Sequence, residues 1–231
     1  DRSGVFILKK DKISYIPIRY SSKEIGVLVQ KLRSEIIVEK AARINNLLGR
    51  LGKVLFPDTE LMREVLNQSR RVIIVPDGLL HYIPFHALRW KGKYIVERLP
   101  ILYSASGSAL FYSRKMKRRG LKSILAVGNP ITELGSLPAS EGEVRAAAEN
   151  FTKVKVLTGK KATETVVKSE IGKYDILLFA THGELLEFSP LLSNLRFTRS
   201  NRDDGKLTVE EIIDSKISAN LVVLSACESG L

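Results

Sequence analysis

Two continuous apolar segments in the second half of the chain constrain its fold more than any other feature. Residues 174–180 and 220–226 each carry a run of apolar side chains that suits one strand but is far too short for a membrane span. Such continuous apolarity is typical of parallel strands that are covered on both faces. A helical pattern precedes each segment, at 163–171 and at 208–214. We therefore expect two buried strands in the parallel sheet of an α/β fold.

The alternation of strands and helices begins near Leu121. Apolar, β-branched stretches predict strands at 123–127 and 154–157, with a helix at 141–151 between them. Together with the two buried segments, they give the order strand, helix, strand, helix that is the signature of a parallel sheet.

Two pairs of residues in this half have the spacing of a capping box, in which a hydroxyl and a carboxylate three residues later satisfy the first amides of a helix. Ser140 and Glu143 are expected to open the helix at 141–151, and Thr208 and Glu211 the short helix that ends near Asp214.

The first half has a different pattern. Its first twenty residues alternate apolar and polar side chains, which predicts a hairpin. Ser21 and Glu24 form a third capping box, before a helical pattern that extends to about Gly49 or Gly52 with a break midway. A basic run at 114–119 closes this half, and we expect a boundary there.

The ends of the two apolar segments carry the residues with the clearest chemistry. His182 and Gly183 follow the first segment, and Cys227 and Gly230 follow the second. The carboxyl ends of parallel strands share one edge of a sheet, where a neighbouring imidazole can activate a thiol for acyl transfer. The pattern alone leaves open a buried, inert Cys227 and a purely structural His182, because a sequence does not reveal strand order.

Several motifs resemble the CHAT domain, a caspase-like cysteine peptidase family related to separase. The similarity extends over nearly the whole chain from about Arg71. Its motifs are Ile-Ile-Val-Pro-Asp-Gly at 73–78, Pro-Phe-His-Ala-Leu at 84–88, Leu-Ala-Val-Gly-Asn-Pro at 125–130, Leu-Pro-Ala-Ser-Glu-Gly-Glu-Val at 137–144, Tyr-Asp-Ile-Leu-Leu-Phe-Ala-Thr-His-Gly at 174–183, Asp-Gly-Lys-Leu-Thr at 204–208 and Leu-Val-Val-Leu-Ser-Ala-Cys-Glu-Ser-Gly at 221–230.

The resemblance implies endopeptidase chemistry with a Cys-His dyad and no acidic third member. Cys227 would attack the scissile carbonyl and His182 would protonate the leaving amine. Backbone N–H groups of Gly183 and Cys227 would bind the oxyanion. Ser225, two residues before the cysteine, and Asn129 would line the pocket for the substrate side chain.

The resemblance also implies an architecture. We expect an α/β protein with a mostly parallel, caspase-like sheet flanked by helices. Residues 1–118 would form an N-terminal accessory α/β subdomain of pseudo-caspase type, and 119–231 the catalytic subdomain. That subdomain would be truncated after the cysteine, with the C-terminal part of the fold missing from this chain. An upstream tetratricopeptide-repeat or sensor module, in the same or a partner chain, would gate cleavage of a protein substrate.

The charge and cysteine content of the chain indicate which partners and which cell compartment to expect. The chain has 37 Lys and Arg against 25 Asp and Glu, a net charge of +12, much of it in the run at 114–119. This run favours anionic partners and could contact nucleic acid, although we expect no direct nucleic-acid function and no membrane contact. One cysteine forms no internal disulfide, which suits the cytoplasm.

No cofactor and no metal are expected. His81 and His86 lie five residues apart, a spacing that places them on neither one helical face nor one strand face, so metal binding by this pair is not predicted. The competing interpretation of the whole chain is a catalytically silent caspase-fold module that binds a protein or a nucleic acid.

Overall fold

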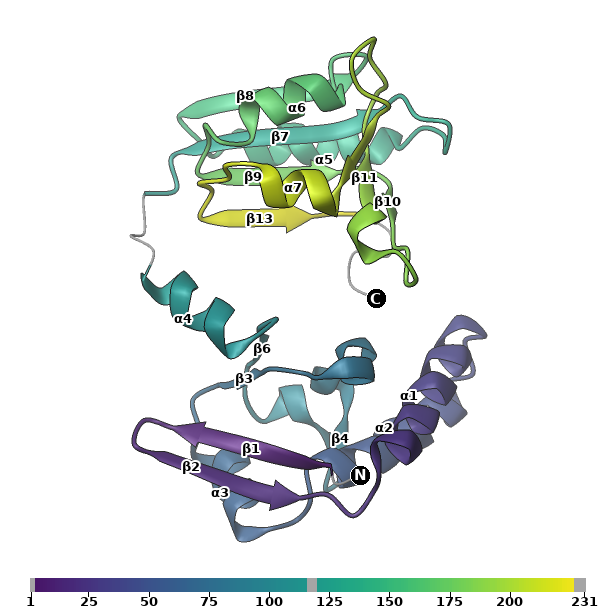
Figure 1. The fold of residues 1–231 in the computed structure, drawn as a ribbon, viewed down its shortest axis with the longest axis vertical. Coiled ribbons are helices and arrows are strands. Elements are labelled where there is room, and N and C mark those ends of the chain that lie inside the picture. Colours follow the sequence, from purple (N-terminus) through teal and green to yellow (C-terminus); the bar gives the residue numbers. More distant parts are fainter. Residues whose placement is uncertain (1–2, 116–119, 227–231) are drawn as a thin grey trace. The chain divides into compact units, whose positions relative to one another are not determined.

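The computed structural model describes residues 3–115 and 120–226 (Figure 1). The chain divides into two compact units, Asp1–Met116 and Lys117–Leu231, each with its own apolar core. Among the described residues, no helix combines the length and apolarity needed to cross a bilayer.

The first unit opens with the predicted hairpin, β1 (Gly4–Lys9) and β2 (Lys12–Pro17), which pair antiparallel. The capping box of Ser21 and Glu24 is confirmed at the start of α1 (Ser22–Ile37). The expected break follows, and α2 (Ala41–Leu55) continues the helical pattern. Glu39 between these helices has a φ of +54°, a left-handed backbone that ends the first helix.

The remainder of the first unit consists of short elements on one apolar core. The largest fully buried side chains of that core include Leu32, Leu51, Leu88 and Ile95. Strands β3 and β6 pair parallel, and β4 and β5 form a small antiparallel pair. The elements are α3 (Glu60–Gln68), β3 (Val72–Ile74), η1 (Gly78–Tyr82), η2 (Phe85–Ala87), β4 (Arg89–Trp90), β5 (Lys93–Tyr94), η3 (Ile95–Glu97), β6 (Ile101–Tyr103) and α4 (Gly107–Lys115).

The second unit is built on a parallel sheet of strand order β13-β9-β7-β8 (Figure 1). Helix α5 covers one face, and α6 and α7 cover the other. This is the expected α/β fold with a parallel sheet between helices. Its elements are β7 (Ser123–Pro130), α5 (Pro138–Ala148), β8 (Lys153–Gly159), α6 (Glu164–Glu170), β9 (Ile176–Ala180), α7 (Val209–Asp214) and β13 (Leu221–Leu224).

Successive side chains of each strand point to opposite faces of the sheet and therefore belong to two different apolar cores. Every residue of β9 is buried, as expected for a strand covered on both faces. Leu177 and Phe179 point to the side of α6 and α7, whereas Ile176 and Leu178 point to the side of α5.

Strand β13 departs from the expected burial. Its four apolar side chains, from Leu221 to Leu224, are between 39% and 46% exposed. Among the described strands, β13 pairs with β9 alone, so it lies at the edge of the sheet. The expectation of a second fully buried strand is therefore wrong for the described residues.

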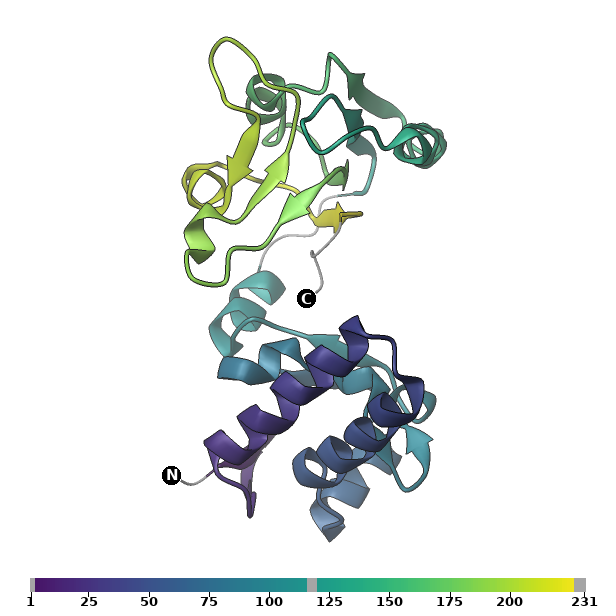
Figure 2. The same cartoon turned by 90° about the vertical axis from the view of Figure 1, so that its right-hand side faces the viewer.

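Three very short strands, which the sequence analysis did not predict, follow β9. They are β10 (Gly183–Glu184), β11 (Asn194–Arg196) and β12 (Lys206–Thr208), with the turn η4 (Pro190–Leu192) between the first two. They form an antiparallel sheet in the order β10-β11-β12, shown in yellow-green in Figure 2. This small sheet carries the chain from the end of β9 to α7.

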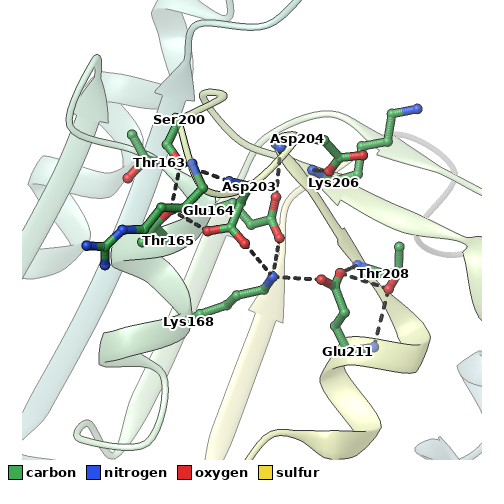
Figure 3. A network of polar contacts seen from close by, with 12 residues as sticks. Thr163, Glu164, Thr165, Lys168, Ser200, Asp203, Asp204, Lys206, Thr208 and Glu211 are labelled. Atoms are coloured by element: carbon green, nitrogen blue, oxygen red, sulfur yellow. Dashed lines mark hydrogen bonds and ion pairs between the residues drawn. The ribbon is translucent and has the colours of Figure 1, made fainter.

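A polar network centred on Lys168 fastens this connection to α6 (Figure 3). The Lys168 ammonium lies 2.5 Å from Glu164, 3.0 Å from Asp203 and 2.6 Å from Glu211. The other oxygen of Glu164 accepts a hydrogen bond of 2.7 Å from the Gly205 N–H. One side chain of α6 thus holds the segment before β12 and the first turn of α7, which leads to β13.

The two capping boxes of this unit have different outcomes. The box of Thr208 and Glu211 is present at the start of α7. The box of Ser140 and Glu143 is absent, because α5 begins at Pro138 and Ser140 already lies inside the helix. Proline suits the first helical position, where its missing N–H costs no helical hydrogen bond.

Candidate functional site

The carboxyl edge of the parallel sheet brings the expected site segments to neighbouring strands. Strand β9 ends two residues before His182, and β13 ends three residues before Cys227. The two strands are adjacent and parallel, with Leu224 paired to Phe179. The pairing continues one residue further, since the Ser225 N–H donates to the Phe179 carbonyl at 2.8 Å. Cys227 itself lies outside the described residues.

The His182 imidazole is in contact with a backbone carbonyl. Its Nε2 lies 3.3 Å from the carbonyl oxygen of Gly135, in the loop between β7 and α5. A carbonyl oxygen only accepts, so Nε2 carries the hydrogen of this contact and Nδ1 is left for another partner. Gly135 has a φ of +98°, a backbone that side chains rarely adopt, so glycine is required to aim this carbonyl.

The backbone around His182 is held by β11. The Arg196 N–H donates to the His182 carbonyl at 2.8 Å. In an antiparallel pair, hydrogen-bonded positions alternate with positions whose amides point away from the partner strand. Gly183, which pairs with Leu195, is at such a position, so its N–H points away from β11.

Arg196 is the most heavily engaged charged side chain near His182. Its side chain is only 8% exposed, and its two terminal nitrogens lie 2.8 Å from Glu133 and 2.5 Å from Glu184. Hydrogen bonds from Asn194 and from Arg196 lower the pKa of the Glu184 carboxyl below its ordinary value. The carboxylate form of Glu184 is therefore favoured beside the histidine.

Asn129, an expected substrate-pocket residue, shapes the loop that carries Gly135. Its side-chain oxygen accepts hydrogen bonds from the Ser136 hydroxyl at 3.0 Å and from the Leu137 N–H at 2.8 Å. Its own N–H donates to the Ser140 hydroxyl at 2.8 Å. Its φ of +46° is a conformation that asparagine tolerates better than most residues.

Ser225, the other expected pocket residue, is exposed just after β13. Its hydroxyl lies 3.3 Å from a carboxylate oxygen of Glu143 on α5. Glu143 was expected to cap α5, but the structure directs its carboxylate to the end of β13. Ser225 thus faces the side of the sheet that α5 covers.

An apolar cavity of about 360 Å³ opens on the opposite face of the sheet. Its wall includes Phe179, Leu207, Ile212, Val222 and Leu224, and it extends to the backbone of Gly183. Such a lining can accept an aliphatic or aromatic side chain.

The remaining sequence candidates lie elsewhere. In the first unit, His86 Nδ1 lies 3.1 Å from the Tyr103 hydroxyl, a structural contact. Among the described residues, no three His, Cys, Asp or Glu side chains gather in the manner of a metal site. Most of the basic run at 114–119 lies outside the described residues.

Several residues near His182 were missed by the sequence analysis. Gly135, Glu133, Glu184 and Arg196 belong to short loops and strands without a periodic pattern. Arg196 had one available signal, because it is a lone charge between the apolar residues Leu195 and Phe197. A charge in such a position is buried only when it is paired.

A parallel sheet between helix layers, with a histidine after one strand and an apolar strand beside it, is consistent with a caspase-like α/β protein. The family model for the CHAT domain matches residues 45–231, and the chain belongs to this family. The match begins well before Arg71, so it includes part of α2. A search of curated proteins found no match.

Proposed function

We propose that this protein is a cysteine endopeptidase that cleaves a protein substrate with a Cys227–His182 dyad. The observation that carries the proposal is the adjacency of β9 and β13, whose carboxyl ends lead to His182 and Cys227. Membership of a caspase-like family supports the same chemistry. Cys227 attacks the scissile carbonyl, and His182 takes the thiol proton and delivers it to the leaving amine.

The geometry around the imidazole supports this division of roles. Because Nε2 donates to Gly135, Nδ1 is the nitrogen that exchanges a proton with the thiol and the leaving group. The Gly183 N–H points away from β11 and, with the N–H of Cys227, stabilises the oxyanion. Ser225 and Asn129 line the substrate pocket as part of the same proposal.

We also propose a cellular compartment and a form of regulation for this activity. The single cysteine suits a reducing compartment, so we place the activity in the cytoplasm. A repeat or sensor module upstream, in the same or a partner chain, gates access of the protein substrate. The dyad itself uses side chains of this chain and needs no cofactor or metal.

The first test separates a catalytic thiol from a structural one. The rate of Cys227 alkylation by iodoacetamide near neutral pH is measured for the wild type, His182→Ala and the control His86→Ala. A thiolate stabilised by His182 reacts fast, so only His182→Ala should slow the reaction. Equal rates in all three proteins would overturn the dyad and favour the silent interaction module.

The second test asks for cleavage directly. The full-length protein, with any upstream module, is incubated with a proteome-derived mixture of folded proteins, and new termini are identified by mass spectrometry. Cys227→Ser and His182→Ala should each abolish the wild-type set of new termini, since removal of a general acid–base costs about 10²- to 10⁴-fold in rate. Termini that persist in both variants would contradict peptidase activity of this site.

A further inference from the structure

We propose that Arg196 is a positioning residue that fixes His182 and its carbonyl partner in one geometry. This inference rests on the proposed peptidase function. Arg196 and the two carboxylates that it binds, Glu133 and Glu184, are here called the arginine clamp. The clamp joins two segments that are far apart in sequence: the loop that carries Gly135 and the turn that carries His182.

The backbone of Arg196 holds the turn itself. Its N–H donates to the His182 carbonyl at 2.8 Å, and its carbonyl accepts a hydrogen bond from the Thr181 hydroxyl. Thr181 is buried, with 1% of its surface exposed. Hydrogen bonds to the backbone of Arg196 in β11 therefore hold both Thr181 and His182, the two residues that follow β9.

The side chain of Arg196 reaches across to the loop between β7 and α5. The start of this loop is already held, because the Ile131 N–H donates to the Thr198 hydroxyl at 2.8 Å. Its end is held by the amide oxygen of Asn129. Glu133 lies between these two points and two residues before Gly135. Its ion pair with Arg196 ties the middle of the loop to the strand that holds His182.

Glu184 provides the second half of the clamp. It lies two residues after His182 and binds both Arg196 and the Asn194 amide, which is 3.2 Å away. Asn194 also donates to the Leu192 carbonyl at 3.0 Å. The two terminal nitrogens of the Arg196 guanidinium thus bind one carboxylate near Gly135 and one near His182, the two residues joined by the imidazole contact.

Arginine suits this role better than lysine. Its planar fork presents nitrogens at fixed angles to two carboxylates at once, whereas a lysine ammonium is a compact point charge whose three donors rotate on a flexible stem. The Arg196 side chain is only 8% exposed, whereas its partners Glu133 and Glu184 are 67% and 39% exposed, so the clamp is anchored at its buried arginine. The clamp therefore fixes the distance between Gly135 and His182, and through it the direction of Nδ1.

The test uses the exposed partner, since the buried arginine could also be needed for folding. Glu133 is 67% exposed, so Glu133→Gln removes its ion pair without opening the core. The readout is the iodoacetamide alkylation rate of Cys227 in the full chain near neutral pH. A misplaced imidazole stabilises less thiolate, so we expect a decrease of roughly two- to fivefold, the range of one partly exposed ion pair.

The matched control is Glu210→Gln, an exposed carboxylate on α7 outside the clamp. It should leave both the alkylation rate and the melting temperature unchanged. Glu184→Gln should slow alkylation in the same direction as Glu133→Gln. Arg196→Lys should slow it as well, since a lysine lacks the planar fork that presents two nitrogens to the two carboxylates.

A double mutant separates positioning from general destabilisation. If the clamp acts through His182, Glu133→Gln should have no further effect in a His182→Ala background. A decrease of the same size in that background would overturn the proposal, because the effect would not pass through the imidazole. A Glu133→Gln rate equal to that of the control would overturn it as well.

The same set of proteins distinguishes failure of the clamp from failure of the proposed function. A slow His182→Ala protein with a fast Glu133→Gln protein rejects the clamp and leaves the dyad intact. A His182→Ala protein as fast as the wild type rejects the dyad and the clamp together, since no imidazole then acts on the thiol.

Discussion

At the residue scale, Lys168 shows how one partly buried charge can hold several segments. Burial disfavours its ammonium, but the hydrogen bonds that it donates to Glu164, Glu211 and Asp203 outweigh this effect and raise the pKa of Lys168 above its ordinary value. Glu164 is 1% exposed, so its carboxylate depends on this lysine for charge compensation.

Replacement of Lys168 by Met should lower the free energy of unfolding by about 3 kcal/mol, because the variant leaves a buried carboxylate without its counter-charge. Urea unfolding followed by circular dichroism measures the change. Lys160→Met, which removes an exposed lysine of the same unit, should change the free energy by less than about 0.5 kcal/mol. Equal effects of the two substitutions would show that the network is not what stabilises this region.

Individual residues differed in how well the sequence revealed them. His182 was predictable at the carboxyl edge because a continuous apolar strand ends two residues before it. Arg196 and Gly135 were not, since their roles depend on a loop and a strand far apart in sequence. Local patterns contain periodicity, but they do not contain contacts between distant loops.

At the scale of elements, helix α5 lies unusually close to β7. A Cβ added at Gly128 would come within 2.7 Å of the Ser140 carbonyl oxygen and within 2.9 Å of a Val144 methyl. Backbone contact of this kind cannot be relieved by a side-chain rotation, so glycine sets the distance between the strand and the helix.

Gly128→Ala should therefore lower the free energy of unfolding by about 2 kcal/mol through overpacking. Gly142 gives the matched control, because it lies in α5 with no atom within 4 Å of its added Cβ. Gly142→Ala should raise the free energy by up to about 1 kcal/mol, since alanine loses less entropy in a helix. Chemical denaturation of both variants checks the signs, and a stabilising Gly128→Ala would refute the close-packing interpretation.

Helices and strands long enough to show a periodic pattern of apolar residues could be predicted, whereas very short elements could not. The helix of Thr208 and Glu211 was predicted correctly, whereas Ser140 and Glu143 matched the same spacing by chance inside a helix that begins at Pro138. The strands β10, β11 and β12 are two or three residues long, too short for an alternating pattern. The apolar sequence of β13 indicated a strand, but not its place at an edge.

At the scale of the whole molecule, several carboxylates of the second unit share a direction of pKa shift. The Thr165 hydroxyl and the Lys168 ammonium lower the pKa of Asp203. Burial raises the pKa of Glu211, but hydrogen bonds from Lys168 and Thr208 lower it by more. The Glu184 carboxyl is lowered as well.

A group whose pKa is lower in the folded state stabilises the fold above its unfolded value and loses that contribution as the pH falls through the folded value. With unfolded values of 3.8 for Asp203 and 4.5 for Glu184 and Glu211, the second unit should keep its stability down to about pH 5 and lose it below about pH 4. Hydrogen exchange of sheet peptides across this range measures the loss.

Lys168→Met supplies the control for this pH dependence. Without the ammonium, the carboxyls of Asp203 and Glu211 should titrate closer to their unfolded values, so the curve of stability against pH should become flatter. A curve as steep as that of the wild type would assign the acid sensitivity to other groups.

The strand order β13-β9-β7-β8 also bears on how the chain folds. Strands β7, β8 and β9 are joined by single helical crossovers, but β13 pairs with β9 only after the chain has passed through β10, β11, β12 and α7. Contacts that close long stretches of chain form late, because loop entropy must be lost before pairing gives any return. We therefore expect β7, β8 and β9 to pair with one another while β13 is still unpaired, so that β13 joins the sheet last among its four described strands.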